Sequence, residues 1–182
     1  MTLSGLKKES EGHTDRSTPK KKVLLTLTGG GFLWEAQSLA NALGSGLEYH
    51  FVTVPDARGK VGVIDLPRGE VHLIEKITAM SSSSFFKKLR NSFVSFVGAY
   101  RVIRKVKPQA VICVGTSIAV PLCFWARVFG IKSIFVESIT RVSRPSQTGK
   151  ILSALRLCDR LYVQWPEAEG LYRGAVYRGT VL

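Results

Sequence analysis

The stretch VLLTLTGGGFLWEAQSLANAL, Val23–Leu43, joins a short apolar run, three consecutive glycines and a segment with apolar residues at helical spacing. This order predicts a strand over Val23–Thr28, a tight turn and a helix over Trp34–Leu43. Glycines at such a turn let the backbone approach a ligand closely, and the helix N-terminus offers N–H groups to a phosphate. A plain strand-to-helix turn explains the glycines equally well. We expect a substrate-binding turn made by Gly29, Gly30 and Gly31.

The glycine turn does not match the common nucleotide-binding motifs. A dinucleotide fingerprint needs a third glycine where Trp34 stands, and we expect that indole to prevent close helix–strand packing, although Asp56 resembles the ribose-binding acid. A phosphate loop needs Lys and then Ser or Thr after the glycines, whereas Phe32 and Leu33 follow here. The sequence therefore supports neither NAD binding nor NTPase chemistry, and we expect no cofactor.

The rest of the chain alternates strand-like and helix-like segments. Strands are expected at Glu48–Val54, Val71–Ile74, Gln109–Val114, Lys132–Val136 and Leu161–Gln164, and helices at Ser84–Lys105, Ile118–Phe129 and Lys150–Leu157. This alternation predicts a single Rossmann-like α/β domain over 22–182, a doubly wound parallel sheet with both faces covered. The polar segment 1–21 is expected to be disordered. Ligands of such sheets bind at the carboxyl ends of the strands.

The positive charge is unevenly distributed along the chain. The formal net charge is +13, and between Glu75 and Glu137 there are ten Lys or Arg and no acidic residue. Segment 81–108 combines these cations with aromatic residues at helical spacing, a pattern typical of an interfacial helix on anionic lipid. The expected membrane contacts are Phe85, Phe86, Lys87, Lys88, Arg90, Phe93 and Phe96. A core helix with a solvated basic face is the alternative; a nucleic-acid or other polyanion partner is disfavoured, because no recognition motif is present.

Other sequence features limit the cellular context. No apolar run reaches the roughly 18 residues that cross a bilayer, and the N-terminus lacks the apolar segment of a secretory signal. We therefore expect a peripheral protein on the cytoplasmic face of a membrane, without a transmembrane helix. The cysteines lie in apolar surroundings without CxxC spacing, so they are expected to be reduced core residues: Cys113, Cys123 and Cys158. His13, His50 and His72 lack the spacing of a metal site, and none is expected.

Four motifs resemble one protein family and span almost the whole globular chain in order. They are LTLTGGGFLWEAQSL at Leu25–Leu39, FVESITRVSRPSQTGKIL at Phe135–Leu152, DRLYVQWPE at Asp159–Glu167 and YRGTVL at Tyr177–Leu182. The first resembles the loop that opens the N-terminal half of two-domain, GT-B type glycosyltransferases. Together they resemble the membrane-anchoring subunit of the N-acetylglucosaminyltransferase that makes dolichol-linked chitobiose, and its bacterial exopolysaccharide relatives. One departure is Phe32, which stands where the family usually has a histidine.

The resemblance implies one half of a split enzyme. In this family one chain supplies the acceptor half and the membrane attachment, and a smaller subunit binds most of the UDP-sugar. The expected reaction is transfer of a sugar from a UDP-sugar to a polyprenyl-pyrophosphate-linked saccharide, catalysed by a heterodimer that is inactive without its donor-binding subunit. The length agrees, since a complete GT-B enzyme needs two Rossmann-like domains and 182 residues supply one. The rival interpretation is a membrane scaffold that recruits a catalytic partner.

Two carboxylates are the candidate catalytic residues. Glu137 follows a predicted buried strand, and we expect it to be a general base on an acceptor hydroxyl, unless it only pairs with Arg141. Glu35, in the expected first turn of its helix, is the other candidate, unless it only complements the helix dipole. The segment after Glu137 is expected to bind substrate through Ser138, Arg141 and Arg144, with the arginines holding a pyrophosphate.

The last predicted strand and the C-terminal residues complete the set of candidates. Gln164 and Trp165 are expected to be an exposed pair that stacks on and hydrogen-bonds a sugar or uridine, unless Trp165 is buried against the partner subunit. The family resemblance implies that Val181 and Leu182 lie at the subunit interface.

Overall fold

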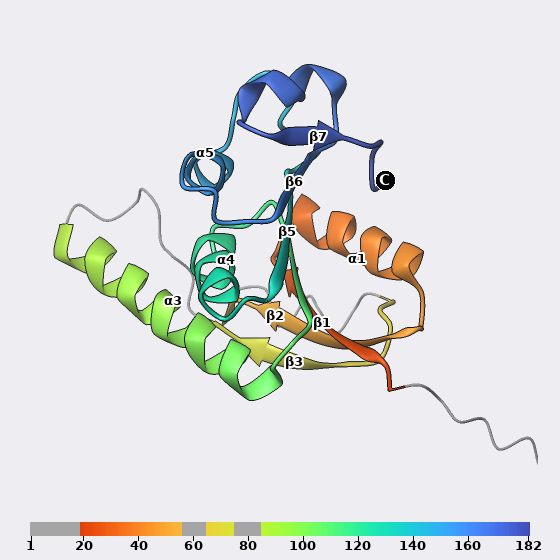
Figure 1. Cartoon of the computed structure of the whole chain (residues 1–182), viewed down its shortest axis with the longest axis vertical. Helices are drawn as coiled ribbons and strands as arrows, with labels where there is room; N and C mark the ends of the chain where they lie inside the picture. Colours follow the sequence, from red (N-terminus) through yellow and green to blue (C-terminus); the bar gives the residue numbers. More distant parts are fainter. Residues whose placement is uncertain (1–18, 56–64, 75–84) are drawn as a thin grey trace, which may run out of the picture.

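The computed structural model describes residues 19–55, 65–74 and 85–182. In these residues seven parallel strands form one sheet in the order β3-β2-β1-β4-β5-β6-β7 (Figure 1). The strands are β1 (Lys21–Leu27), β2 (Leu47–Thr53), β3 (Gly69–Leu73), β4 (Ala110–Val114), β5 (Lys132–Val136), β6 (Arg160–Val163) and β7 (Ala175–Tyr177). The helices are α1 (Gly31–Leu43), α3 (Phe85–Val106), α4 (Ala119–Val128) and α5 (Gln147–Ala154), followed by the 3₁₀ helix η2 (Pro166–Leu171).

Helices cover both faces of the sheet (Figure 1). One core contains residues of α1 and the side chains that β1 and β2 turn toward it, such as Leu25 and Phe51. The other contains residues of α3, α4 and α5 together with the opposite side chains, such as Leu24 and Val52. This alternation follows from the two-residue period of a strand, and central strands such as β4 (AVICV) read as continuous apolar runs because both of their faces are buried. The doubly wound parallel sheet is confirmed.

The strand order reverses between β1 and β4. From β1 the chain runs outward through β2 to β3, and it then returns to β4 on the other side of β1. Leu25 of β1 pairs with Ile112 of β4, so both strands end at the same edge of the sheet. Neighbouring loops diverge at such a switch point, and they leave room for a ligand at the carboxyl ends of the strands.

The elements differ from the expected ones mainly near the C-terminus. Helix α5 begins three residues earlier than the apolar pattern indicates, because Ser146 is its N-cap and accepts a hydrogen bond from Gly149 N at 2.9 Å. η2 and β7 were not predicted, since both are too short to carry a periodic pattern. Lys21 is already part of β1, whereas most of the polar segment 1–21 lies outside the described residues. Of the helices that the structure describes, none has the length and apolarity to span a bilayer.

Candidate active site at the carboxyl edge of the sheet

The turn after β1 opens helix α1 without a side-chain cap. Gly30 is the N-cap residue with φ 78°, a left-handed conformation that favours glycine. Among the residues that the structure describes, no side chain caps the first N–H groups of α1, and a Cβ on Gly31 would meet open space. The N-terminus of α1 therefore presents free donors to an anion at this edge. Trp34 is 60% exposed, so its indole does not separate the helix from the sheet as the sequence suggested.

Three buried hydroxyls at this edge lack a partner in the described residues, one of them on Thr53 at the end of β2. Thr28 Oγ1, just after β1, and Ser117 Oγ, just after β4, have no hydrogen-bond partner within the part of the chain that the structure describes. A buried hydroxyl without a partner costs about 1–3 kcal/mol, so such groups commonly mark a place where a ligand or water binds. Their position beside the switch point agrees with the glycine turn as the ligand-facing edge.

Phe32 stacks its ring against the turn after β4. A Cβ on Gly115 would lie 2.4 Å from Phe32 Cδ1, and Gly115 has φ 55°. Only glycine fits there, because the position is both left-handed and covered by the ring. At the position where the motif resemblance implies a histidine, this chain therefore has an apolar contact that joins the glycine turn to the β4 loop. Phe32 has no titratable group, so it contributes packing and no proton transfer.

Glu35 lies at the centre of a buried hydrogen-bond network. It is the fifth residue of α1, past the first turn, and it is 1% exposed. Its Oε1 accepts from Ser138 Oγ at 2.8 Å. Its Oε2 accepts from Ile139 N at 3.2 Å and Gln164 Nε2 at 2.6 Å. The carboxylate thus ties α1 to the loop after β5 and to the end of β6, instead of complementing the helix dipole.

Gln164 belongs to the same network and is buried, contrary to the expected exposed Gln–Trp pair. It is 2% exposed, and its Nε2 also donates to the Glu137 carbonyl at 2.9 Å. Its Oε1 accepts from Val181 N at 2.9 Å. All of these partners come from other segments, so an alternating strand pattern alone does not reveal that the amide is used inside the protein.

Glu137 is buried beside Glu35 but has its own partners. It is 1% exposed; Oε1 accepts from Ser138 N at 3.0 Å, and Oε2 accepts at 2.5 Å from both Ser146 Oγ and Tyr172 OH. In the ranges the structure describes, no ion pair joins Glu137 to Arg141, so the alternative role as its salt-bridge partner is not observed. The partners of Glu137 lie instead at the start of α5 and after η2.

Tyr172 and Gly149 enclose the Glu137 carboxylate. Burial, together with the hydrogen bond to Glu137, raises the pKa of Tyr172 to about 12, so the phenol stays protonated and donates at neutral pH. A Cβ on Gly149 would lie 2.5 Å from the Tyr172 ring and 2.6 Å from Glu137 Oε2. Neither Tyr172 nor Gly149 was predicted, although TGKIL within the second family motif contains the glycine.

Trp165 contacts the same loop, and Val181 contacts Gln164. Trp165 is half-buried, and its Nε1 donates to the Ile139 carbonyl at 2.6 Å, so its indole N–H is not free for a sugar. Val181 is half-buried against the core beneath α1, and Leu182 is 63% exposed. Of the two predicted interface residues, Val181 is anchored to its own chain and Leu182 is accessible.

The structure thus gives the loop Ser138–Arg144 a rigid base and an open surface. Both carboxylates are buried, and each of their oxygens accepts at least one hydrogen bond, a geometry that positions the loop. Arg141 and Arg144 are exposed, and their guanidinium groups form no ion pair in the described ranges. What faces outward is cationic, next to the free donors of α1. This arrangement suits a phosphate or pyrophosphate group.

A second surface lies on the α3 and α4 side of the sheet. It is an open apolar groove of about 600 Å³ lined by Ser92, Phe93, Phe96, Val97, Tyr100, Phe124 and Trp125. Phe93 is 68% exposed, and Val128 of α4 is 56% exposed. Exposed cations lie near the groove: Arg101 lines an adjoining pocket with Phe93 and Val97. Arg104 lies over the ring of Phe129, which contacts Tyr100 and Trp125. Of the predicted membrane contacts, Phe93 and Phe96 line the groove, whereas the side chains of Phe85, Phe86, Lys87, Lys88 and Arg90 lie outside the described part.

The remaining residues with reactive or metal-ligating side chains are the cysteines and histidines. Cys113 and Cys123 are buried, and all three cysteines are free thiols. Burial raises the pKa of Cys158 to about 12, which keeps that thiol protonated and unreactive. His13 lies outside the described residues. His50 and His72 come together although their sequence spacing gave no sign of it.

The fold is that of one half of a GT-B glycosyltransferase. Acinetobacter baumannii MurG superposes with a TM-score of 0.60 at 20% identity, over 81% of this chain and 42% of that chain. The family model described as "Oligosaccharide biosynthesis protein Alg14 like" matches residues 67–181. The chain therefore belongs to the Alg14-like family, as the motifs predicted.

Two relatives illustrate the extent of the match. The UDP-N-acetylglucosamine transferase subunit ALG14 of Yarrowia lipolytica is 36% identical over 105 residues, which are 54% of this chain and 48% of that protein. The human subunit of the same name is 28% identical over 191 residues, which are 91% of this chain and 86% of that protein. This chain thus spans about half of the first relative and most of the second. Both are named as subunits of a transferase.

Proposed function

We propose that this chain is the acceptor-side subunit of a two-chain glycosyltransferase. Together with a donor-binding subunit, it transfers a sugar from a UDP-sugar to a polyprenyl-pyrophosphate-linked saccharide at the cytoplasmic face of a membrane. The observation that carries the proposal is the open cationic loop Ser138–Arg144 next to the uncapped N-terminus of α1, at the switch point of a GT-B half. The names of the relatives support UDP-N-acetylglucosamine as the donor.

The pyrophosphate of the acceptor binds at the carboxyl edge. In the described part of the chain, the first N–H groups of α1 have no side-chain cap and the hydroxyls of Thr28 and Ser117 have no partner, and a pyrophosphate offers the matching acceptors. Arg141 and Arg144 add charge-assisted hydrogen bonds from the opposite loop. Transfer is favoured because the lipid-linked group is held in one orientation while its sugar hydroxyl faces the donor subunit.

Glu35 and Glu137 act as positioning residues. Their carboxylates fix the backbone from Glu137 to Ile139, and this places the arginines that follow. A buried carboxylate that accepts hydrogen bonds on both oxygens holds such geometry well, because losing any partner costs free energy. The partner subunit docks across this edge, where Leu182 is exposed. In this assignment the chain contributes binding and orientation, and the completed cleft needs the second chain.

Membrane attachment uses the groove between α3 and α4. Aromatic side chains there are exposed in a cluster, and the surrounding cations suit anionic headgroups. An attached chain holds its carboxyl edge near lipid-linked substrate. Attachment at this surface leaves the edge itself free for the donor subunit.

The test is transfer of radiolabel from UDP-N-acetylglucosamine to lipid-linked acceptor, with this chain alone, the donor-binding subunit alone, and both. Transfer only with both is expected. Arg141→Ala and Arg144→Ala should each lower kcat/KM roughly tenfold or more, because each removes a charge-assisted bond. Arg160→Ala, an exposed arginine at the start of β6, is the matched control.

The rival scaffold function predicts a different pattern. If both arginine variants keep full transfer activity and only variants of the α3–α4 groove lose it, the chain is a membrane scaffold and the acceptor site lies on the partner. If this chain transfers sugar alone, the proposed division between two subunits is wrong.

A further inference from the structure

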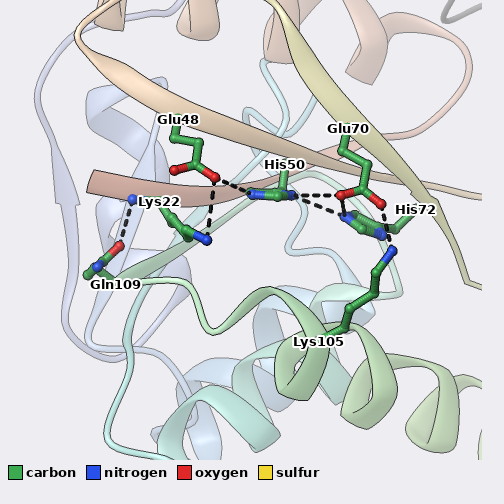
Figure 2. Close-up of polar contacts among 7 residues, drawn as sticks. All are labelled: Lys22, Glu48, His50, Glu70, His72, Lys105 and Gln109. Carbon is green, nitrogen blue, oxygen red and sulfur yellow. Dashed lines mark hydrogen bonds and ion pairs between the residues drawn. The ribbon is translucent and has the colours of Figure 1, made fainter. Parts of the chain in front are cut away.

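A cluster of metal-ligating side chains lies on strands β2 and β3. It is separate from the hydrogen-bond network of Glu35, Glu137 and Gln164, the carboxyl-edge network. His50 pairs in register with Glu70, and Val52 pairs with His72. Residues two apart on a strand share a face, so parallel pairing brings His50, Glu70 and His72 together on the face that α3 covers. Figure 2 shows the two imidazoles and the Glu70 carboxylate directed toward one another, with Lys105 of α3 beside them.

The ligand atoms form a triangle of suitable size for a metal ion. His50 Nδ1 lies 3.2 Å from His72 Nε2, and Glu70 Oε2 lies 3.7 Å from the first and 3.8 Å from the second. Zinc bonds of about 2.0–2.1 Å in tetrahedral geometry place ligand atoms roughly 3.3–3.4 Å apart. Small side-chain rotations, within what an exposed glutamate permits, bring the three atoms to that separation. Both imidazoles are buried, whereas Glu70 is exposed and gives access from solvent.

The surrounding residues orient these ligands. Glu48 Oε1 lies 3.2 Å from His50 Nε2, so that nitrogen donates to the carboxylate and Nδ1 keeps a free lone pair. A carboxylate on the distal nitrogen of a histidine is the usual second-sphere support of a metal ligand. Lys105 Nζ donates to Glu70 Oε1 at 2.6 Å, which leaves Oε2 toward the imidazoles.

We propose that His50, Glu70 and His72 bind one divalent transition metal ion, zinc being the best match to two nitrogens and one carboxylate oxygen. The ion joins the edge strand β3 to β2 and, through Glu70 and Lys105, braces the C-terminal part of α3. Its role is to stabilise the part of the sheet that supports the α3–α4 groove. The alternative is a hydrogen bond between the two imidazoles with no metal.

The experiment uses the full chain, stripped with a chelator and titrated with zinc or cobalt chloride. We expect one equivalent to bind, a rise in Tm, and a cobalt absorption spectrum of nitrogen and oxygen ligands without thiolate charge transfer. His50→Ala and His72→Ala should weaken binding at least tenfold, and Glu48→Gln roughly tenfold as a second-sphere change. His13→Ala is the matched control, since His13 is the third histidine of the chain.

Two further variants keep the proposal testable if a histidine variant fails to fold. Glu70→Gln changes an exposed ligand without opening a cavity, and it should weaken binding at least tenfold. Lys105→Gln keeps an N–H donor for Glu70 Oε1 but removes the cation beside it, so it should tighten binding roughly three- to tenfold. Unchanged affinity in both variants, or no binding of either metal to the unaltered chain, would overturn the metal site and leave the imidazole hydrogen bond.

Discussion

The carboxyl-edge network and the α3–α4 groove invert the usual distribution of polar and apolar groups. At the carboxyl edge, the carboxylates of Glu35 and Glu137 are buried. In the groove, aromatic residues such as Phe93 face solvent. Buried charges are retained where they fix a geometry, and exposed apolar clusters are retained where another molecule covers them. The first region should therefore control stability and loop position, and the second should control binding to a surface.

The largest effect on stability is expected for Glu35→Gln. Both Glu35 oxygens accept hydrogen bonds, and the substitution replaces one of them with an N–H₂ group, which cannot accept. At least one donor among Ser138 Oγ, Ile139 N and Gln164 Nε2 therefore loses its acceptor. The free energy of unfolding should fall by about 2–4 kcal/mol, measured by urea denaturation. Glu167→Gln, an exposed carboxylate of η2, should change it by less than about 0.5 kcal/mol. Equal losses in the two variants would show that the network does not stabilise the fold.

Gly149→Ala should have the next largest effect. The added methyl overlaps the Tyr172 ring and the Glu137 carboxylate, and both are enclosed by protein. Overpacking of this kind costs about 1–3 kcal/mol, which should outweigh the better helix propensity of alanine. The matched control is Gly170→Ala, where the methyl meets open space. A Gly149→Ala variant as stable as its control would mean that α5 shifts to accept the methyl.

Tyr172→Phe should lower the free energy of unfolding by about 1–2 kcal/mol at neutral pH, because Glu137 loses a donor. The pKa of Tyr172 is raised to about 12 from an ordinary value near 10, so the folded state favours the protonated phenol. Its stabilising contribution is complete below the unfolded pKa and is lost as pH rises through the folded pKa. Unfolding from pH 9 to about 12 should therefore depend less steeply on pH in the variant. An unchanged slope would contradict this assignment.

Phe93→Gln should have the smallest effect on stability and a large one on membrane binding. Its side chain is 68% exposed, so the free energy of unfolding should change by less than about 0.5 kcal/mol. Co-sedimentation with phosphatidylserine-rich vesicles should weaken roughly tenfold, because one aromatic side chain no longer enters the interface. Leu155→Gln, 64% exposed at the end of α5, is the control and should bind vesicles normally. Identical binding of both variants would remove the groove as the attachment surface.

The sequence was sufficient for the architecture because architecture depends on patterns that are local. Apolar runs such as Val111–Val114, alternating with helical segments, predict a parallel sheet, and the glycine turn marks its first crossover. The family motifs also contain residues at the carboxyl ends of the strands. They identified Glu35, Glu137 and Gln164 as unusual residues without indicating that all three are buried.

Tertiary structure decided which partners those residues have. Glu35 and Gln164 are 129 positions apart, and only the strand order of the sheet brings them within hydrogen-bond distance. The same holds for His50 and His72, which meet through the register of β2 and β3. Hydrogen bonds, burial and metal ligation depend on distances between segments, whereas helix and strand preferences depend on neighbours along the chain. By itself the sequence determined the fold and the family, and only the packed chain determined what its carboxylates and histidines contact.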